Sequence, residues 1–63
     1  MNKTENMDRL EALRAQANTM EDALALVGHD APPIRREVED ALAALRVFRD
    51  ALYKAEEALE GVK

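Results

Sequence analysis

Three arginines and one tyrosine are the side chains of this 63-residue sequence best suited to binding an anion. Arg46, Arg49 and Tyr53 lie about one turn apart on one predicted helix, and Arg14 is predicted to reach the same level from another. Guanidinium groups donate paired hydrogen bonds that match the oxygens of a carboxylate or a phosphate. These four residues therefore form a candidate site for a small anionic group such as a phosphate or a carboxylate.

The same arginines also have carboxylates within reach on their own helices. Arg46 precedes Asp50 by four residues and Arg14 follows Glu11 by three, which are the spacings of ion pairs on a helix surface. Pairing with carboxylates alone is therefore the alternative interpretation. Because Arg14 and Arg49 carry like charges on facing helices, we expect an acidic group between them, supplied by another chain or by a ligand.

Groups for catalysis or metal binding are sparse in this sequence. The single histidine, His29, adjoins Asp30, but there is no serine or cysteine that this pair could activate as a nucleophile. The absence of cysteine removes thiolate sites, and no Glu-x-x-His motif is present to build a di-metal centre in a helix bundle. We therefore predict that the protein is not an enzyme and uses neither a metal nor a cofactor.

One turn-forming segment, GHDAPP at residues 28–33, divides the chain. Its glycine suits the left-handed residue just past a helix end, its aspartate can cap the next helix, and its two prolines can begin that helix. The sequence predicts a single all-α domain, residues 1–63, with helices at about 3–27 and 33–60. A connection of about five residues makes such helices antiparallel neighbours.

The outer ends of both helices also carry terminal signals. Asn2 and Glu5 match a variant of the capping box at the start of the first helix, and Gly61 marks the end of the second. Together with the turn, these residues predict a two-helix antiparallel hairpin.

The spacing of apolar residues predicts how the two helices pack. Apolar positions alternate by three and four residues, which is the repeat of left-handed supercoiled helices. The first helix contributes Leu10, Leu13, Ala17, Met20, Leu24 and Val27, and the second contributes Ile34, Val38, Ala41, Leu45, Phe48, Leu52, Ala55, Leu59 and Val62. Folding the chain at its turn predicts six apolar layers, from Val27 opposite Ile34 to Leu10 opposite Leu52.

Self-association is predicted because the hairpin alone has little to bury. A chain of 63 residues without disulfides or metal is marginally stable by itself. In the predicted register, Leu59 and Val62 extend past the apolar part of the first helix, and a flank of alanines widens the apolar face of the second. The predicted interface comprises Leu42, Ala44, Ala51, Ala55, Ala58, Leu59 and Val62. The expected assembly is a homo-oligomer, a dimeric four-helix bundle of two hairpins.

Charge and hydropathy narrow the possible partners. The net charge of −4 is opposite in sign to that of most nucleic-acid-binding domains. No apolar run approaches the roughly 20 residues of a membrane-spanning helix. The polar, acidic N-terminal segment differs from a secretory signal, so we expect a cytoplasmic protein.

In length, hairpin layout and heptad spacing, the chain resembles the Rop family of plasmid copy-number regulators, which dimerise into four-helix bundles. That resemblance implies RNA binding by the first helix, yet residues 3–22 contain three basic and five acidic side chains. The chain is also similar in kind to small alanine-rich helical oligomers with which phages sequester signalling nucleotides. That similarity implies anion binding between subunits by Arg14, Arg46, Arg49 and Tyr53.

These observations predict a small regulator or assembly module of bacterial or phage type that binds itself and a protein partner. The C-terminal end of the second helix is the predicted contact with that partner. A nucleotide-sequestering protein is the first alternative, and a Rop-like RNA-binding regulator is the second.

Overall fold

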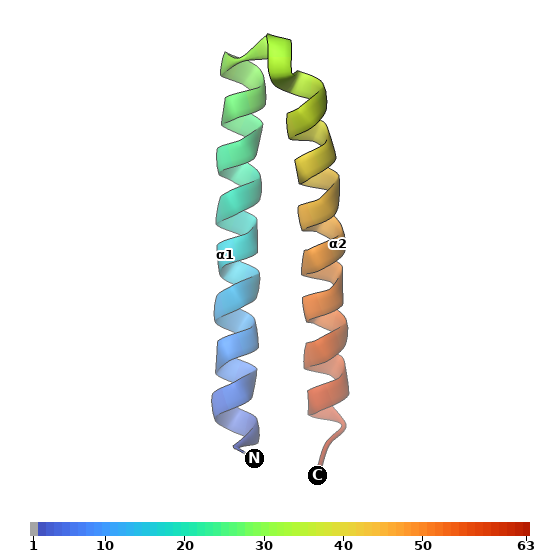
Figure 1. The fold of residues 1–63 in the computed structure, drawn as a ribbon. Coiled ribbons are helices and arrows are strands. Elements are labelled where there is room, and N and C mark those ends of the chain that lie inside the picture. Colours follow the sequence, from blue (N-terminus) through green and yellow to red (C-terminus); the bar gives the residue numbers. More distant parts are fainter. Residues whose placement is uncertain (1) are drawn as a thin grey trace.

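The computed structural model describes residues 2–63, which form two long antiparallel helices joined by a short turn (Figure 1). Helix α1 spans Lys3–Asp30, the single 3-10 turn η1 spans Pro32–Ile34, and helix α2 spans Arg35–Glu60. The hairpin measures 49 × 15 × 12 Å. The predicted all-α antiparallel hairpin is confirmed.

The first helix begins as the capping-box pattern predicts. The Oδ1 atom of Asn2 accepts a hydrogen bond of 2.9 Å from the backbone N–H of Glu5. The Glu5 carboxylate pairs with Arg9 instead of returning to Asn2, so only half of the box forms. At the other end of the chain, α2 stops directly before Gly61, as expected.

Lys3 joins the two free ends of the hairpin. Its Nζ atom donates hydrogen bonds to the backbone carbonyls of Glu60, at 2.9 Å, and Val62, at 2.7 Å. A lysine at this place supplies positive charge and donors to the C-terminal end of a helix, where carbonyls lack partners. The start of α1 therefore caps the end of α2.

The prediction that the first helix ends at residue 27 is wrong, because α1 continues to Asp30. Gly28 lies inside the helix and has no positive φ, so it is not a left-handed cap. A Cβ atom on Gly28 would lie 3.1 Å from Cγ1 of Val38, which is tighter than most such contacts, so the Val38 side chain would have to shift by a few tenths of an ångström. The glycine lets the second helix pass close by without such a shift.

The turn is correspondingly shorter than predicted. The backbone N–H of Ala31 donates to the carbonyl of Val27 at 2.8 Å, which closes α1. Asp30 is the last residue of α1 and does not cap the next element. The two prolines begin the 3-10 turn, so α2 starts at Arg35 and not at residue 33.

The predicted register between the helices is also wrong. Val38 was expected opposite Leu24, but it lies against Gly28, one helical turn nearer the loop. Antiparallel helices keep this offset along their length, so opposite residues have numbers that total 66, as Gly28 and Val38 do. The offset places Leu24 opposite Leu42 and does not place Leu13 opposite Phe48.

We call the positions that face each other between the helices the inner stripe. Every one of them is buried or half-buried, and their spacing alternates by three and four residues. The inner stripe comprises Leu10, Arg14, Ala17, Glu21, Leu24 and Gly28 of α1 and Val38, Leu42, Leu45, Arg49, Leu52, Glu56 and Leu59 of α2. Half of the predicted core positions of α1 are thus replaced by arginine, glutamate and glycine.

Candidate functional site

The apolar residues displaced from the inner stripe form a second line along the outside of the hairpin, which we call the outer stripe. Its members are seven residues apart, and all but Ala41 are exposed. The outer stripe comprises Leu13, Met20 and Val27 of α1, Ile34 of η1, and Ala41, Phe48, Ala55 and Val62 of α2. Exposure reaches 53% for Met20 and 48% for Phe48, which is high for large apolar side chains.

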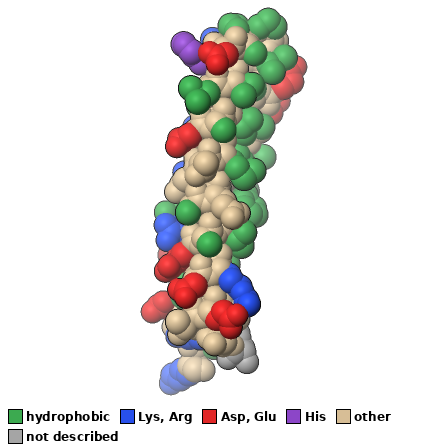
Figure 2. Space-filling model, turned by 90° about the vertical axis from the view of Figure 1, so that its left-hand side faces the viewer, with side chains coloured by type: hydrophobic (Ala, Val, Ile, Leu, Met, Phe, Trp, Pro, Cys, Tyr) green, Lys and Arg blue, Asp and Glu red, His purple; other side chains and the backbone are tan. Residues whose placement is uncertain are grey.

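Both halves of the outer stripe lie on the same side of the hairpin. On each helix the stripe precedes an inner-stripe position by one residue, which is about 100° around the helix axis. In antiparallel helices, equivalent offsets project to the same side. Figure 2 shows the result, with hydrophobic side chains gathered along one margin of the molecule from the loop end past the middle. A contiguous apolar face of this kind typically marks an interaction site.

Two charged layers interrupt the inner stripe. In the first, Arg14 of α1 donates from Nε to Glu56 of α2 at 3.0 Å and from Nη2 at 3.3 Å. Its Nη1 atom donates to the Tyr53 hydroxyl at 3.4 Å, and its Cζ atom lies 4.7 Å from the centre of the Tyr53 ring. The hydrogen bonds to Glu56 and Tyr53 raise the pKa of Arg14 above its ordinary value. Arg14 therefore remains charged, and its donors are engaged by Glu56 and Tyr53 of the same chain.

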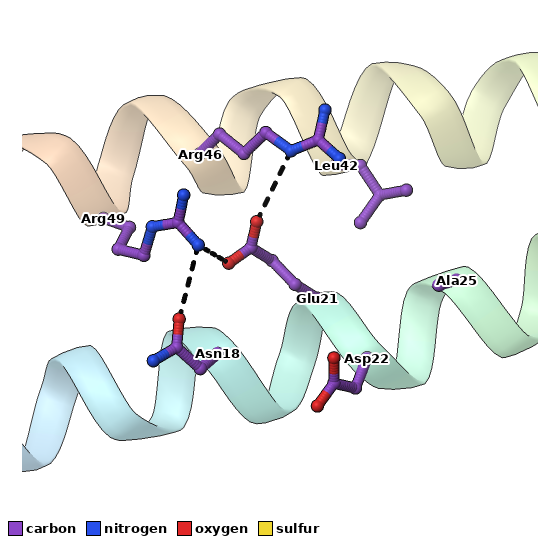
Figure 3. A pocket seen from close by; sticks show the side chains of 7 residues that line it. All are labelled: Asn18, Glu21, Asp22, Ala25, Leu42, Arg46 and Arg49. Carbon is purple, nitrogen blue, oxygen red and sulfur yellow. Dashed lines mark hydrogen bonds and ion pairs between the residues drawn. The ribbon is translucent and has the colours of Figure 1, made fainter.

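The second charged layer centres on Glu21 of α1, shown in Figure 3. Arg49 of α2 donates from Nη1 to the Glu21 carboxylate at 2.7 Å and to Oδ1 of Asn18 at 3.4 Å. Arg46 approaches the other carboxylate oxygen more loosely, at 3.6 Å from its Nε atom. One largely buried carboxylate thus holds two guanidinium groups, of which Arg49 is the better enclosed.

The four predicted anion-site residues are therefore divided between two ion-pair groups. Arg14 and Tyr53 belong to the Glu56 layer, whereas Arg46 and Arg49 belong to the Glu21 layer. The predicted pairs with Glu11 and Asp50 are not formed, because carboxylates on the opposite helix lie closer. The acidic groups expected near the arginines come from the same chain, and no ligand or second chain is needed to supply them.

A hollow beside the second layer has no surplus of positive charge. It is lined by two arginines, two carboxylates and three uncharged side chains, drawn in Figure 3: Arg46, Arg49, Glu21, Asp22, Asn18, Ala25 and Leu42. An anion entering there would meet the Glu21 and Asp22 carboxylates as well as the guanidinium groups. The geometry therefore gives the hollow no preference for a negatively charged ligand.

The predicted interface residues divide into two groups in the structure. Leu42 and Leu59 are half-buried inner-stripe residues, and the register places Leu59 opposite Met7, which is half-buried too. The mismatched end predicted at Leu59 is therefore absent. The other five are exposed: Ala44, Ala51 and Ala58 beside the outer stripe, and Ala55 and Val62 within it.

Sequence reasoning missed the two glutamates that organise the charged layers. Matching unlike charges across the hairpin could have found them, because the residue numbers of both pairs, Arg14 with Glu56 and Glu21 with Arg49, have the same total of 70. It also assigned Leu13, Met20 and the other outer-stripe residues to the core, although they are the exposed face.

Other site types have no support within residues 2–63. No three His, Cys, Asp or Glu side chains there come close enough together to hold a metal ion. Neither of the two long helices in that range is apolar enough to cross a membrane. No protein-family model, curated protein or solved structure matches the chain. The outer stripe is therefore the feature on which a function can be based.

Proposed function

We propose that this protein is a non-enzymatic helical-hairpin assembly module that self-associates through its outer stripe and acts as a small regulator by binding a protein partner. One observation carries the proposal: eight positions spaced by seven residues are apolar, and seven of them are exposed. Such regularity is that of a helix-packing surface, because a seven-residue repeat keeps a stripe facing one neighbouring helix.

The angle between the two stripes supports a four-helix bundle. In a bundle of four helices each helix touches two neighbours, and the directions to those neighbours are roughly perpendicular. The inner and outer stripes lie about 100° apart on each helix. The inner stripe is used within the hairpin, and the outer stripe is directed toward a second pair of helices.

The polar inner stripe gives a reason for association. Arg14, Glu21, Arg49 and Glu56 occupy positions where a self-sufficient hairpin would place leucine or isoleucine. Charged pairs in an interface contribute little net stability compared with apolar packing. The hairpin therefore buries few large apolar side chains internally and gains the missing burial by association.

Light scattering coupled to gel filtration tests the proposal. At micromolar concentrations we expect at least twice the monomer mass of 7.0 kDa. Phe48→Glu should shift the protein toward the monomer, because a charge in an apolar interface is costly. A wild-type protein that remains monomeric at 100-fold higher concentration would contradict the proposal.

A matched pair of alanine substitutions controls for nonspecific effects of added charge. Ala55 belongs to the outer stripe, whereas Ala43 is exposed on a different face of the same helix. We expect Ala55→Glu to weaken association and Ala43→Glu to leave it unchanged, with similar helix content by circular dichroism for both. Equal weakening by both substitutions would count against the outer stripe as the interface.

The anion-binding alternative has weaker support than association. Every guanidinium of the predicted cluster has a glutamate partner on the opposite helix. A nucleotide would have to displace Glu21 or Glu56, so its binding would be opposed by the carboxylate that it leaves nearby. Calorimetry with cyclic oligonucleotides, on wild type and on Arg49→Ala, tests this alternative directly.

A further inference from the structure

We infer that the occupant of the outer stripe is a second copy of this chain in inverted orientation, related by a two-fold axis that crosses the hairpin at the level of Met20. The inference rests on the proposed function and specifies its geometry. In this arrangement the loops point to opposite ends of the bundle, α1 packs against α1 of the partner subunit, and α2 packs against α2 of the partner subunit.

The outer stripe of α1 is symmetric about Met20. Leu13 and Val27 are each seven residues away from it, and the next position toward the N-terminus is the polar residue Asn6. Inverting a second copy about Met20 brings Leu13 opposite Val27 of the partner subunit and Met20 opposite Met20 of the partner subunit. Every large apolar residue of this stretch then meets another, as a self-complementary two-fold interface requires.

The same axis also matches the residues of α2. The register of the hairpin places residue 46 at the level of Met20. Residues equally distant from this level then pair across the axis, so that Phe48 meets Ala44 of the partner subunit and Ile34 meets Ala58 of the partner subunit. Large side chains face small ones in both contacts, which is how packed helix layers interdigitate. In this arrangement, exposed alanines beside the outer stripe leave room for the larger side chains of the partner subunit to pack.

Charges at the rim of this interface agree with inversion. Asp40 and Lys54 are exposed on the outer flank of α2, and neither forms an ion pair within residues 2–63. They lie six and eight residues from level 46, on opposite sides of it, so each approaches its counterpart on the partner subunit. Opposite charges at an interface rim favour one orientation over others.

An upright second copy, with both loops at one end, fits less well. Helix α2 would then lie beside α1 of the partner subunit, and each residue of α2 would stand at the same height as the α1 position that it opposes within its own hairpin. The apolar C-terminal part of α2, at Ala58 and Val62, would face the polar start of that helix, near Lys3 and Asn6. Inversion instead places it against the apolar loop end, because the outer stripe covers all of α2 but only the loop-side part of α1.

The available area is adequate for a dimer. A face 49 Å long and 15 Å wide has a footprint on the order of 700 Å², close to the roughly 800 Å² per partner that stable complexes bury. An inverted copy centred near the middle of the hairpin covers most of this length. A short peptide segment would cover only part of it.

Spin labels on the full-length chain distinguish the two orientations. Thr4 is exposed at the far end of α1, sixteen residues from the proposed axis. With labels at Thr4→Cys, an inverted dimer separates the two labels by about 48 Å along the bundle, at 1.5 Å per residue. In an upright dimer they lie at the same level, separated by the bundle width of roughly 25 Å.

Cross-linking provides a second, independent readout. Met20→Cys should form a disulfide between subunits under mild oxidation, whereas Val27→Cys should do so only when mixed with Leu13→Cys. A dimer mass with a label distance near 25 Å, or with efficient self-cross-linking of Val27→Cys alone, would overturn the inverted geometry while leaving self-association intact. A monomer mass for the wild type would overturn both proposals.

Discussion

Glu21 makes contacts with two arginines, and comparing the strengths of these two contacts is the most discriminating test of the inner stripe. One carboxylate accepts from Arg49 at 2.7 Å and lies 3.6 Å from Arg46, so the two contacts share a partner and differ in geometry. The Arg49 side chain is 31% exposed and that of Arg46 is 63% exposed. We expect the first contact to set the stability of this layer and the second to contribute little.

The expected magnitudes follow from this difference in exposure. Exposed ion pairs contribute about 0–1 kcal/mol, and hydrogen bonds to charged groups contribute about 1.5–3 kcal/mol. The Glu21 side chain is only 12% exposed, so its bond with Arg49 falls between these ranges. We expect a coupling energy of about 1.5 kcal/mol for Glu21 with Arg49 and less than about 0.5 kcal/mol for Glu21 with Arg46.

Two double-mutant cycles measure these couplings. The substitutions Glu21→Gln, Arg49→Gln and Arg46→Gln are made singly and in pairs, and thermal unfolding is followed by circular dichroism at one fixed protein concentration. Glu21→Gln alone should lower the Tm by roughly 6–12 °C, since 1 kcal/mol corresponds to about 4–8 °C in a domain of this size. Equal coupling energies in the two cycles would refute the claim that enclosure of the Arg49 pair determines its strength.

Three further predictions concern the register, a helix cap and the close approach near the turn. The double variant Leu24→Cys with Leu42→Cys should form an intrachain disulfide readily, whereas Leu24→Cys with Val38→Cys should not; the reverse result would restore the register expected from apolar spacing alone. Asn2→Ala should lower the free energy of unfolding in a urea titration by about 1 kcal/mol through loss of the N-cap bond, and an unchanged midpoint would show that the cap is not used. Gly28→Leu should cost roughly 1–3 kcal/mol in the same titration, because its side chain has no room beside Val38, and a neutral effect would contradict the close packing there.

The helices and their outer ends could be predicted from the sequence because local signals specify them. Asn2 and Gly61 mark the two outer boundaries correctly. The turn was predicted less well, because a glycine near a helix end usually indicates a left-handed cap, whereas Gly28 serves to admit a neighbouring helix. That role depends on a residue ten positions away and leaves no local signal.

The register could not be predicted from apolar spacing, because the predicted core of α1 and its inner stripe share half of their residues. Leu10, Ala17 and Leu24 belong to both the predicted core and the inner stripe. The predicted core completes this set with Leu13, Met20 and Val27, whereas the inner stripe completes it with the next residue in each case: Arg14, Glu21 and Gly28. Both choices alternate by three and four residues. Hydrophobicity alone favours the apolar choice, which assigns the exposed outer stripe to the core and does not identify the ion-pair partners.

Charge distinguishes the two choices, and the reason is that only one register pairs unlike charges. In the predicted register Arg14 lies beside Arg49, whereas in the structure each of them has its own glutamate, Glu56 and Glu21. A partly buried guanidinium without a carboxylate is costly, and polar residues at core positions of helix pairs are known to fix register at some expense in stability. In the proposed dimer, the cost within the hairpin is accompanied by a gain outside it, because the charged layers hold both helices rotated so that Met20 and the other large apolar residues of the outer stripe face outward. On this reasoning, charge reversal of a whole layer by Glu21→Arg with Arg49→Glu preserves both the register and self-association, whereas Glu21→Arg alone places three arginines together and disturbs both. Light scattering reports on self-association, and disulfide formation after adding Leu24→Cys and Leu42→Cys reports on the register. Recovery of neither property in the charge-reversed double variant would show that the charged layers do not position the outer stripe.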